Sequence, residues 1–392
     1  MEEQFVHFEE QLIAAGLVNP GDALMAFLDE DISWSRPSPD QEFATRLFEG
    51  LNINSLIVSK AAEPYQSIID YLAETADGSI LPQDCETRTF LHDLPVALAF
   101  LPEQVIPLLK QRKSVIVPGK GLITYGTISL EQSFVTFSSV CFAVFVKFFS
   151  DYLAAYKKGV IPADFQDVFQ RVIRFLPPPP QFEGTLAQGP FTHEEQVLMA
   201  MDEAGKMTIR HRLVDSFFGN ISCRLGDVLY ISQTGSSLDH LAGCIDPCAM
   251  DGSSCAAMTA SSELSAHMEI IRKTGHRAIL HGHPRFSVIL SMDCDVDACA
   301  KGDSCYLTCS YKREVSGIPI VPGEVGTGPY GLCNTVPSAI KGKDGVIVYG
   351  HGLFTTAPQD FNLAFSRLMT IENTCREAYF RRIGRSDPSL SE

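Results

Sequence analysis

A chain of 392 residues is long enough for two domains of ordinary size, each with its own buried core. The 31 basic and 47 acidic side chains give a net charge of −16, and no basic run occurs, which argues against nucleic acid or an anionic membrane surface as a partner. The acidic N-terminus lacks the apolar segment of a secretory signal, and the apolar run at 134–149 is interrupted by polar residues and too short to cross a bilayer. We therefore expect a cytoplasmic protein.

Cysteine usage leaves two interpretations open. The chain has twelve cysteines, and seven of them crowd into two short stretches. In a reducing cytosol they can be small buried apolar side chains, but thiolates clustered in short loops are also what a structural zinc or iron–sulfur site needs. The spacings C-x3-C-x6-C and C-x4-C-x5-C-x3-C match no familiar fingerprint of such a site. The seven are Cys244, Cys248 and Cys255, then Cys294, Cys299, Cys305 and Cys309.

Two segments of the first half follow a pattern of strand and helix that recurs later in the chain. They read SLIVSKAAEPYQSII at 55–69 and KSVIVPGKGLITYGTISLEQSFVTFSS at 113–139. Their counterparts in the second half are RAILHGHPRFSVIL at 277–290 and DGVIVYGHGLFTTAPQDFNLAFSRLMT at 344–370. Because both segments recur in the same order, a duplicated domain is a better explanation than chance.

A proline run at 177–180 and the polar stretch after it, QFEGTLAQGP, separate the two halves. Such a sequence is stiff and cannot continue a helix, so we expect a linker at 177–191 between a first domain at 1–176 and a second at 192–385. The second domain opens with THEEQVLMAMDEAG, where Thr192 and Glu195 have the spacing of a capping box and apolar residues then follow a helical period.

The second half mixes short apolar segments with helical patterns. Helices are expected at 262–274, at 286–292 and at 359–382, and an Asp- and Cys-rich loop or insertion at 293–311. This order shows no strict β–α–β alternation, so it favours a sheet with helices layered on it, in the α/β or α+β range. The expected strands are 220–225, 227–232, 277–281, 317–322 and 345–350.

Three histidines each stand at the end of an apolar strand and beside a glycine: His281 and His283 in HGHP, and His351 in YGHGL. His281 and His283 project the same way, because the side chains of a strand alternate with a period of two. One such histidine alone would more often be a core residue. Three of them with an open position form a catalytic rather than a structural metal site, and nitrogen ligands suit Zn²⁺, with Mn²⁺, Co²⁺ or Fe²⁺ as alternatives.

Glu263 is the candidate acid/base residue beside that metal. A bound metal polarises a carbonyl or alkoxide oxygen, and moving a proton on the neighbouring carbon requires a base close by. The alternative role of this carboxylate is to complement the dipole at a helix start, and the two roles are compatible.

The same helix start is a candidate anion site. Ser261 and Ser262 precede Glu263 where free backbone N–H groups favour phosphate or carboxylate. The turns Gly219-Asn220 and Thr234-Gly235 would let the backbone approach a ligand closely, although each is also ordinary turn chemistry.

The order of these motifs resembles the class II aldolase and adducin family, whose members include L-fuculose-phosphate aldolase. The resemblance covers roughly residues 192–385 and depends on the combination of motifs rather than on any one of them. It implies a three-layer α/β/α sandwich with a largely antiparallel central sheet, duplicated in this chain, and commonly assembled as a tetramer with sites at subunit interfaces. The motifs are GNIS at 219–222, ISQTG at 231–235, SSE at 261–263, HGHP at 281–284 and YGHGL at 349–353.

The resemblance also implies roles for the site residues. His281, His283 and His351 would bind zinc, and Glu263 would be the acid/base residue. The substrate phosphate would be held by Asn220, Thr234, Gly235, Ser261 and Ser262. The sugar-phosphate 4-epimerases of the family have aspartate at the position of Glu263, so glutamate favours an aldolase-type lyase acting on a small hydroxy-carbonyl substrate. The alternatives are a decarboxylase or dehydratase of the same family, or a non-catalytic, adducin-like assembly protein.

Several features depart from the family pattern. The glycine-rich GTAGN-type motif is DSFFGN here, at 215–220, and the 293–311 segment lies where Tyr306 or Tyr311 would supply a substrate-facing tyrosine. The first half is a copy stripped of metal ligands, which could occupy the place of a neighbouring subunit in a homo-oligomer, a dimer or tetramer. Aligning the two halves through their shared prolines places Ala61 and Glu63 opposite His281 and His283, and Glu42 approximates the position of Glu263. The second pair of recurring segments places Lys120 opposite His351.

Overall fold

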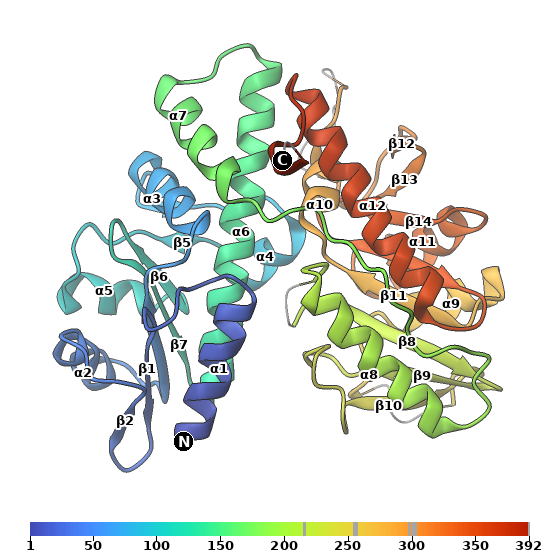
Figure 1. The fold of residues 1–392 in the computed structure, drawn as a ribbon, viewed down its shortest axis with the longest axis horizontal. Helices are drawn as coiled ribbons and strands as arrows, with labels where there is room; N and C mark the ends of the chain where they lie inside the picture. The colour runs from blue at the N-terminus through green and yellow to red at the C-terminus, as the bar shows by residue number, and fades with distance from the viewer. Residues whose placement is uncertain (215–216, 254–257, 297–298, 300–303, 391–392) are drawn as a thin grey trace. The chain divides into compact units, whose positions relative to one another are not determined.

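The computed structural model describes every residue except 215–216, 254–257, 297–298, 300–303 and 391–392. The chain forms two compact units, Met1–Pro177 with Pro388–Glu392, and Pro178–Asp387 (Figure 1). The division falls within the proline run, one residue after the expected end of the first domain.

The first unit is built on a five-stranded sheet in the order β2-β1-β3-β7-β6, in which all neighbours are antiparallel. Helices α2 and α5 cover one face and contribute to its core, whereas α6 packs on the other face with α1 and α3. The elements are α1 (Glu2–Ala14), β1 (Leu24–Leu28), β2 (Ile32–Trp34), α2 (Gln41–Gly50), β3 (Ser55–Ser59), α3 (Tyr65–Thr75), β4 (Ser79–Ile80), α4 (Cys85–Leu91), β5 (Leu94–Pro95), α5 (Pro102–Leu109), β6 (Ser114–Val117), β7 (Gly121–Gly126), α6 (Leu130–Lys157) and α7 (Ala163–Val172), followed by a 3-10 turn (Ile173–Phe175).

The apolar run at 134–149 belongs to a longer helix, α6, than the sequence suggested. The run at 134–149 is the middle of a 28-residue helix, which is long and apolar enough to cross a bilayer. However, 83% of its most apolar window is buried inside the unit, against β3, β7, α1 and α3. A helix that is apolar on all sides is also what the centre of a core requires.

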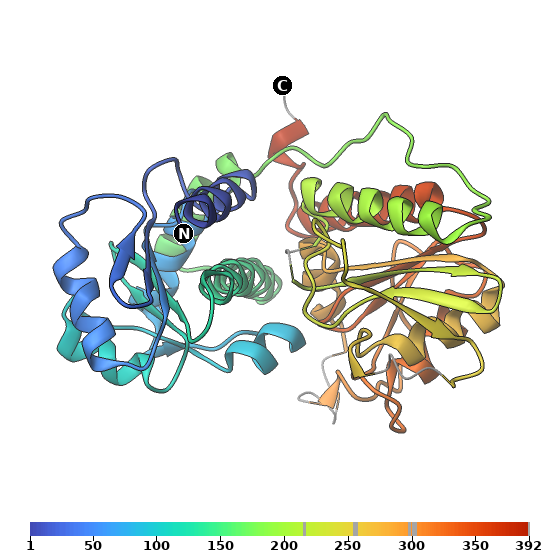
Figure 2. The same cartoon turned by 90° about the horizontal axis from the view of Figure 1, so that it is seen from below.

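The second unit has an eight-stranded sheet in the order β10-β9-β8-β11-β15-β14-β13-β12, and only the β13–β14 pair among these described strands is parallel. Helices α8 and α12 cover one face, and α9 and α11 cover the other (Figure 2). The expected three-layer arrangement is therefore present. The elements are α8 (Glu194–Arg210), β8 (Asn220–Leu225), β9 (Val228–Ser232), β10 (Ile245–Ala249), α9 (Leu264–Thr274), β11 (Ala278–Gly282), α10 (Arg285–Met292), β12 (Arg313–Val315), β13 (Ile318–Val321), α11 (Leu332–Ile340), β14 (Gly345–Val348), β15 (Leu353–Ala357) and α12 (Phe361–Arg382).

The start of α8 differs from the expected capping box. The helix begins at Glu194, one residue later than a Thr192 cap would require. The side chain of Gln196, not of Glu195, accepts the backbone N–H groups of Thr192 at 2.9 Å and His193 at 3.3 Å. Glutamine and glutamate both fill this role, and the sequence offers them at adjacent positions.

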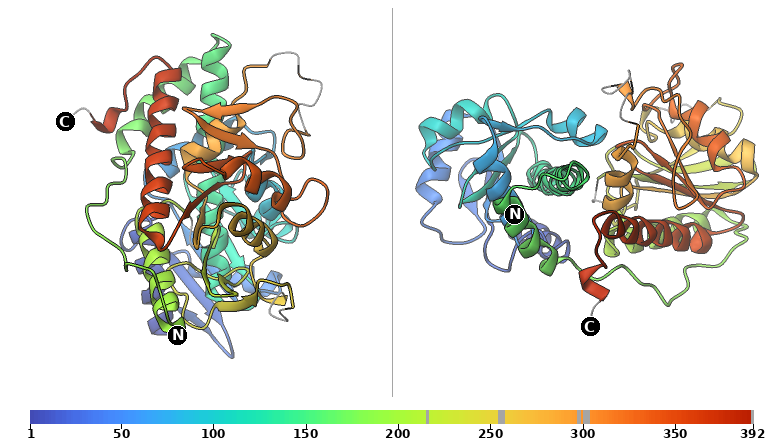
Figure 3. Two further views of the ribbon diagram at one scale, coloured as in Figure 1. Left: turned by 90° about the vertical axis from the view of Figure 1, so that its right-hand side faces the viewer. Right: turned by 90° about the horizontal axis from the view of Figure 1, so that it is seen from above.

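The expected linker is packed against the second unit. The N–H of Leu186 donates to Asn362 Oδ1 at 2.7 Å, and the N–H of Gly189 donates to Asp360 Oδ2 at 2.9 Å, both at the start of α12. The ribbon of this segment runs alongside that helix (Figure 3). The carbonyl of Pro180 accepts a hydrogen bond from Asn373 further along the same helix. Residues 178–191 therefore form a strap on α12 rather than a free spacer.

Candidate metal centre

Three neighbouring strands bring the three histidines together. His281 and His283 flank Gly282 at the end of β11, and His351 lies in the tight turn between β14 and β15, where its N–H donates to the carbonyl of Val348 at 3.1 Å. Strands β11 and β15 are antiparallel, so the end of one lies beside the start of the other. The ligand nitrogens lie within 4.8 Å of one another, and the three residues are at most 4% exposed.

Glu263 completes the cluster from the other side. It is the N-cap residue of α9, but its carboxylate makes no capping hydrogen bond to that helix. Instead Oε1 lies 3.2 Å from Nε2 of His351 and Oε2 lies 3.5 Å from Nε2 of His281. Asn220, at the start of β8, donates to Oε2 at 2.8 Å. The carboxylate is therefore aimed at the histidines and held there.

The surroundings fix the histidine rings. Nδ1 of His281 lies 3.2 Å from the carbonyl oxygen of Leu353, and it can only donate to that oxygen, so Nε2 of the neutral ring carries the lone pair. The ring of His281 stacks on Phe354 at 3.9 Å, and the ring of His283 stacks on Phe218 at 5.5 Å. Phe218 belongs to the DSFFGN motif, so this departure from the family pattern covers one face of a candidate ligand.

Burial decides the protonation of this cluster. It lowers the pKa of His281 to about 3 despite the neighbouring Glu263, and it holds the pKa of His283 well below its ordinary value. Burial alone would raise the pKa of Glu263, but His281, His351 and the hydrogen bond from Asn220 outweigh it and hold that pKa below its ordinary value. At neutral pH His281 and His283 are therefore neutral and Glu263 is ionised.

This arrangement fits a divalent cation. The Nε2 atoms of His281 and His283 are 3.0 Å apart and share a small buried space with the negative charge of Glu263. The ionised carboxylate is buried there, and a buried charge without a counter-charge is costly. Three neutral imidazoles with one nearby carboxylate are a ligand set that zinc accepts, and Mn²⁺, Co²⁺ or Fe²⁺ can use the same atoms.

Two glycines allow the close approach of these segments. A Cβ on Gly352 would lie 2.5 Å from the carbonyl oxygen of Gly282 and 2.7 Å from the ring of His281. Gly219 has φ +80, and a Cβ there would lie 2.4 Å from the carbonyl oxygen of His281. The glycines of YGHGL and FGN are therefore required by the packing around the ligands.

The residues expected to bind phosphate lie around the start of α9, but two of the backbone donors there are occupied. The N–H of Ser262 donates to Thr234 Oγ1 at 3.1 Å, and the N–H of Glu263 donates to Ser261 Oγ at 3.3 Å. Gly235 takes a positive φ of 72 in the adjoining turn. Asn220 is committed through its amide nitrogen to Glu263, whereas its buried Oδ1 has no partner.

Several supporting residues were not anticipated from the sequence. Glu372 on α12 accepts the N–H groups of Phe286 at 2.8 Å and Ser287 at 2.9 Å, which anchors the start of α10 directly after HGHP. His267 is fully buried one turn after Glu263, and its Nδ1 lies 2.7 Å from Ser222 Oγ on β8. The spacing of four between Glu263 and His267 was the sequence signal that could have found this pair.

The cysteines and the candidate tyrosines lie outside this cluster. Cys248 is fully buried in β10 and belongs to the core of the second unit, as the apolar interpretation expects. Cys255 lies outside the described residues. Of the described side chains, only the three histidines form a group of three candidate ligands within 4.8 Å. Tyr306 and Tyr311 are 38% and 51% exposed, and their substrate role stays a prediction.

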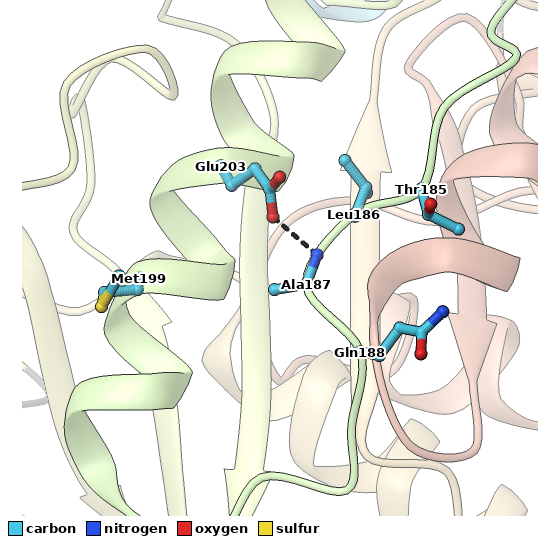
Figure 4. A pocket seen from close by; sticks show the side chains of 6 residues that line it. All are labelled: Thr185, Leu186, Ala187, Gln188, Met199 and Glu203. Carbon is cyan, nitrogen blue, oxygen red and sulfur yellow. Dashed lines mark hydrogen bonds between the residues drawn. The ribbon is translucent and has the colours of Figure 1, made fainter.

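A surface hollow of the second unit is separate from the histidines. It lies between the strap and α8, and its one carboxylate, Glu203, already accepts the N–H of Ala187 at 2.7 Å (Figure 4). The exposed Met199 adds no reactive group. We therefore place the chemistry at the histidine cluster. The lining residues are Thr185, Leu186, Ala187, Gln188, Met199 and Glu203.

Comparison with known proteins agrees with the motifs. Residues 200–379 match the family model of the Class II Aldolase and Adducin N-terminal domain. Comparison with curated protein sequences finds no match.

Among solved structures, an L-fuculose-1-phosphate aldolase from Thermus thermophilus is 24% identical, with a TM-score of 0.39 over 48% of this chain and 96% of its own. YgbL from Escherichia coli, described as a putative aldolase/epimerase/decarboxylase, is 18% identical, with a TM-score of 0.37 over 45% and 84%. A sugar-phosphate aldolase from Thermotoga maritima is 17% identical, with a TM-score of 0.37 over 51% and 98%. The family match therefore covers residues 200–379, within the second unit, and takes in the motifs that resemble the class II aldolase and adducin family.

Proposed function

We propose that the second unit is a metal-dependent lyase that cleaves or forms a carbon–carbon bond in a small hydroxy-carbonyl substrate, with a sugar phosphate as the candidate substrate. The observation that carries the proposal is the meeting of three buried histidines and one ionised, buried glutamate at a single sheet end. His281, His283 and His351 would hold the metal, with zinc as the expected ion.

A metal bound there would act as a Lewis acid on the substrate carbonyl or hydroxyl oxygen. Glu263 is in its basic form at neutral pH, because its pKa is held below its ordinary value. It can therefore take a proton from a substrate hydroxyl or carbon and return it later in the same turnover. The hydrogen bond from Asn220 leaves one carboxylate oxygen, Oε1, on the side of His351 for this work.

The proposed phosphate end lies at the start of α9. Ser261, Ser262, Thr234 and Gly235 adjoin there, and Asn220 donates to the neighbouring carboxylate of Glu263. Since two backbone donors are already paired, we expect side-chain hydroxyls to provide much of the contact.

Decarboxylation or dehydration would use the same metal ligands and the same acid/base residue, so product analysis must separate the reactions.

A non-catalytic assembly role is our proposal only for residues 1–176, with residues 192–385 carrying the chemistry. We further propose a cytoplasmic homo-oligomer, a dimer or tetramer, which size-exclusion chromatography with light scattering would test.

The test is product formation from candidate hydroxy-carbonyl compounds with and without phosphate, using native protein, Glu263→Gln and His283→Ala. We expect loss of turnover in both variants, with metal retained in the first and lost in the second. Glu269→Gln is the matched control, because this residue lies on the same helix, is exposed and pairs with Arg272. Unchanged turnover in both site variants would reject the lyase assignment, whichever product is monitored.

A further inference from the structure

We propose that the first unit is a second copy of the metal-binding domain. Its backbone keeps the positions that correspond to the site, but every metal ligand has been replaced. The first observation is topological. The order β2-β1-β3-β7-β6 of the first sheet matches β9-β8-β11-β15-β14 in the second, strand for strand along the chain. All four neighbouring pairs are antiparallel in both sheets.

The register of the strands agrees residue by residue. Ser114 pairs with Thr124 in the first sheet, and Gly345 pairs with Thr355 in the second, so both partners are displaced by 231 positions (345 − 114 and 355 − 124). This displacement equates Lys120 with His351. The next pairing, Ser55 with Gly126, corresponds to Ala278 with Ala357, which equates β3 with β11 at a displacement of 223 (278 − 55).

The helix start that holds Glu263 is reproduced at the same displacement of 223. In the second unit the N–H of Glu263 donates to Ser261 Oγ at 3.3 Å, and in the first the N–H of Asp40 donates to Ser38 Oγ at 3.2 Å. Asp40 is the N-cap residue of α2, as Glu263 is of α9. No insertion therefore separates helix from strand between the two copies.

A pair of glycines confirms the local geometry. A Cβ on Gly121 would lie 2.2 Å from the carbonyl oxygen of Ser59 and 2.6 Å from Cα of Lys60. Its counterpart Gly352 makes the same approach to the carbonyl oxygen of Gly282, the counterpart of Ser59. The backbones of the two ligand-bearing segments therefore meet in the first unit as they do in the second.

This register replaces the alignment based on the shared prolines. The chain takes five residues from the end of β3 to the start of α3, from 60 to 64, but only two from β11 to α10, 283 and 284. Aligning the prolines therefore displaced the strand by three positions. The counterparts of Glu263, His281, His283 and His351 are Asp40, Val58, Lys60 and Lys120, so Glu42, Ala61 and Glu63 are not the equivalent residues.

These replacements remove the metal site. Valine has no ligand atom, and two lysine ammonium groups repel a cation at neutral pH. Lys60 and Lys120 are exposed, and the ammonium of Lys120 lies over the ring of Phe100 at 5.2 Å.

The interior has changed as well. Asn220, Ser222 and His267 correspond to residues that belong, with Val58, to the apolar core of the first unit. The metal-binding interior of one copy is thus the hydrophobic core of the other, so we assign the metal and the chemistry to the second unit alone. The three counterparts are Leu24, Ala26 and Ala44.

The test is to rebuild the site in the full chain with Asp40→Glu, Val58→His, Lys60→His and Lys120→His. This inference rests on metal binding by the second unit, and native protein should contain one zinc ion per chain. The rebuilt chain should contain two, and a cobalt-substituted sample should show a doubled visible absorption. The matched control is Ala61→His, Glu63→His and Lys120→His, which follows the proline-based alignment and should still bind one ion.

A second variant guards against misfolding of the rebuilt core. The double change Lys60→His with Lys120→His alters only exposed positions. It is made in a background that also has His283→Ala and His351→Ala, so that any bound ion belongs to the first unit. We expect this variant to gain one zinc ion per chain that the background lacks, released at a lower chelator concentration than the native ion. A folded variant that gains none would overturn the inference. Native protein without metal would instead reject the proposed function.

Discussion

Nε2 of His351 lies 3.2 Å from Oε1 of Glu263, although one residue lies in the turn between β14 and β15 and the other begins α9. His281 and His351 hold the pKa of Glu263 below its ordinary value against the effect of burial, so an ionised carboxylate lies buried beside the proposed ligands at neutral pH. The same contact places the proposed acid/base group directly beside the proposed metal ligands.

Metal removal should destabilise the protein. A ligand that binds only the folded state adds about 2.7 kcal/mol to the free energy of unfolding at one hundred times its Kd. We expect the melting temperature to fall when a chelator is added and to recover with zinc. His283→Ala protein should melt at the temperature of the chelated native protein and should not respond to chelator. Equal responses of native and variant protein would contradict a histidine-bound metal.

Acid should destabilise the metal-free protein well above the pKa of its carboxylates. Burial lowers the pKa of His281 to about 3 and that of His267 to about 4, so between these values and about 6.5 the unfolded state binds more protons than the folded state. The free energy of unfolding is therefore highest above pH 6.5 and decreases as the pH falls. Each of these histidines lowers it by about 2 kcal/mol at pH 5. Urea unfolding midpoints of chelated protein at pH 7, 6 and 5 would measure this slope. His267→Phe should show a shallower one.

Much of the site could be predicted from the sequence, because its ligands follow strands whose apolar runs are easily recognised. His281, His283 and His351 were found from H-x-H spacing and flanking glycines, and the structure brings them together. The strands β10 and β12 and the helix α11 were missed, since each is short or contains proline.

Contacts between distant segments could not be read from local patterns. The anchoring of the HGHP turn by Glu372 depends on how α12 crosses the sheet, which no local pattern encodes. The sequence suggested a duplication, but the register that we propose for it had to come from the strand pairing, because loop lengths differ where the prolines agree.

His267 should position the site rather than react. Its ring packs edge-on against Phe354 at 5.8 Å, and Phe354 stacks on His281. His267→Ala would leave the hydroxyl of Ser222 buried without its partner and open a cavity, so we expect a loss of about 2 kcal/mol in the free energy of unfolding. Metal affinity should fall about 10-fold or more, as for other residues that support ligands.

The informative companion is the double variant Ser222→Ala with His267→Ala. It reproduces the Ala26 and Ala44 pair of the first unit and leaves no buried hydroxyl unpaired. Stability should therefore recover in part, whereas metal affinity should stay low. If both properties recovered together, His267 would be a purely structural residue.

Gly352 offers the sharpest test of the packing around the ligands. In Gly352→Ala a new methyl group would lie 2.5 Å from the carbonyl oxygen of Gly282, 2.7 Å from the ring of His281 and 2.9 Å from the ring of His283. Two of the three contacts are with the proposed ligands, so the imidazoles must move apart and metal affinity should fall by at least 10-fold, with a stability loss of about 1–3 kcal/mol from overpacking. Gly328→Ala is the matched control, because a Cβ there meets nothing within 4 Å and no positive φ is required. Competitive titration of both variants against a zinc chelator would measure the difference, and equal affinities would mean that the turn does not constrain the ligands.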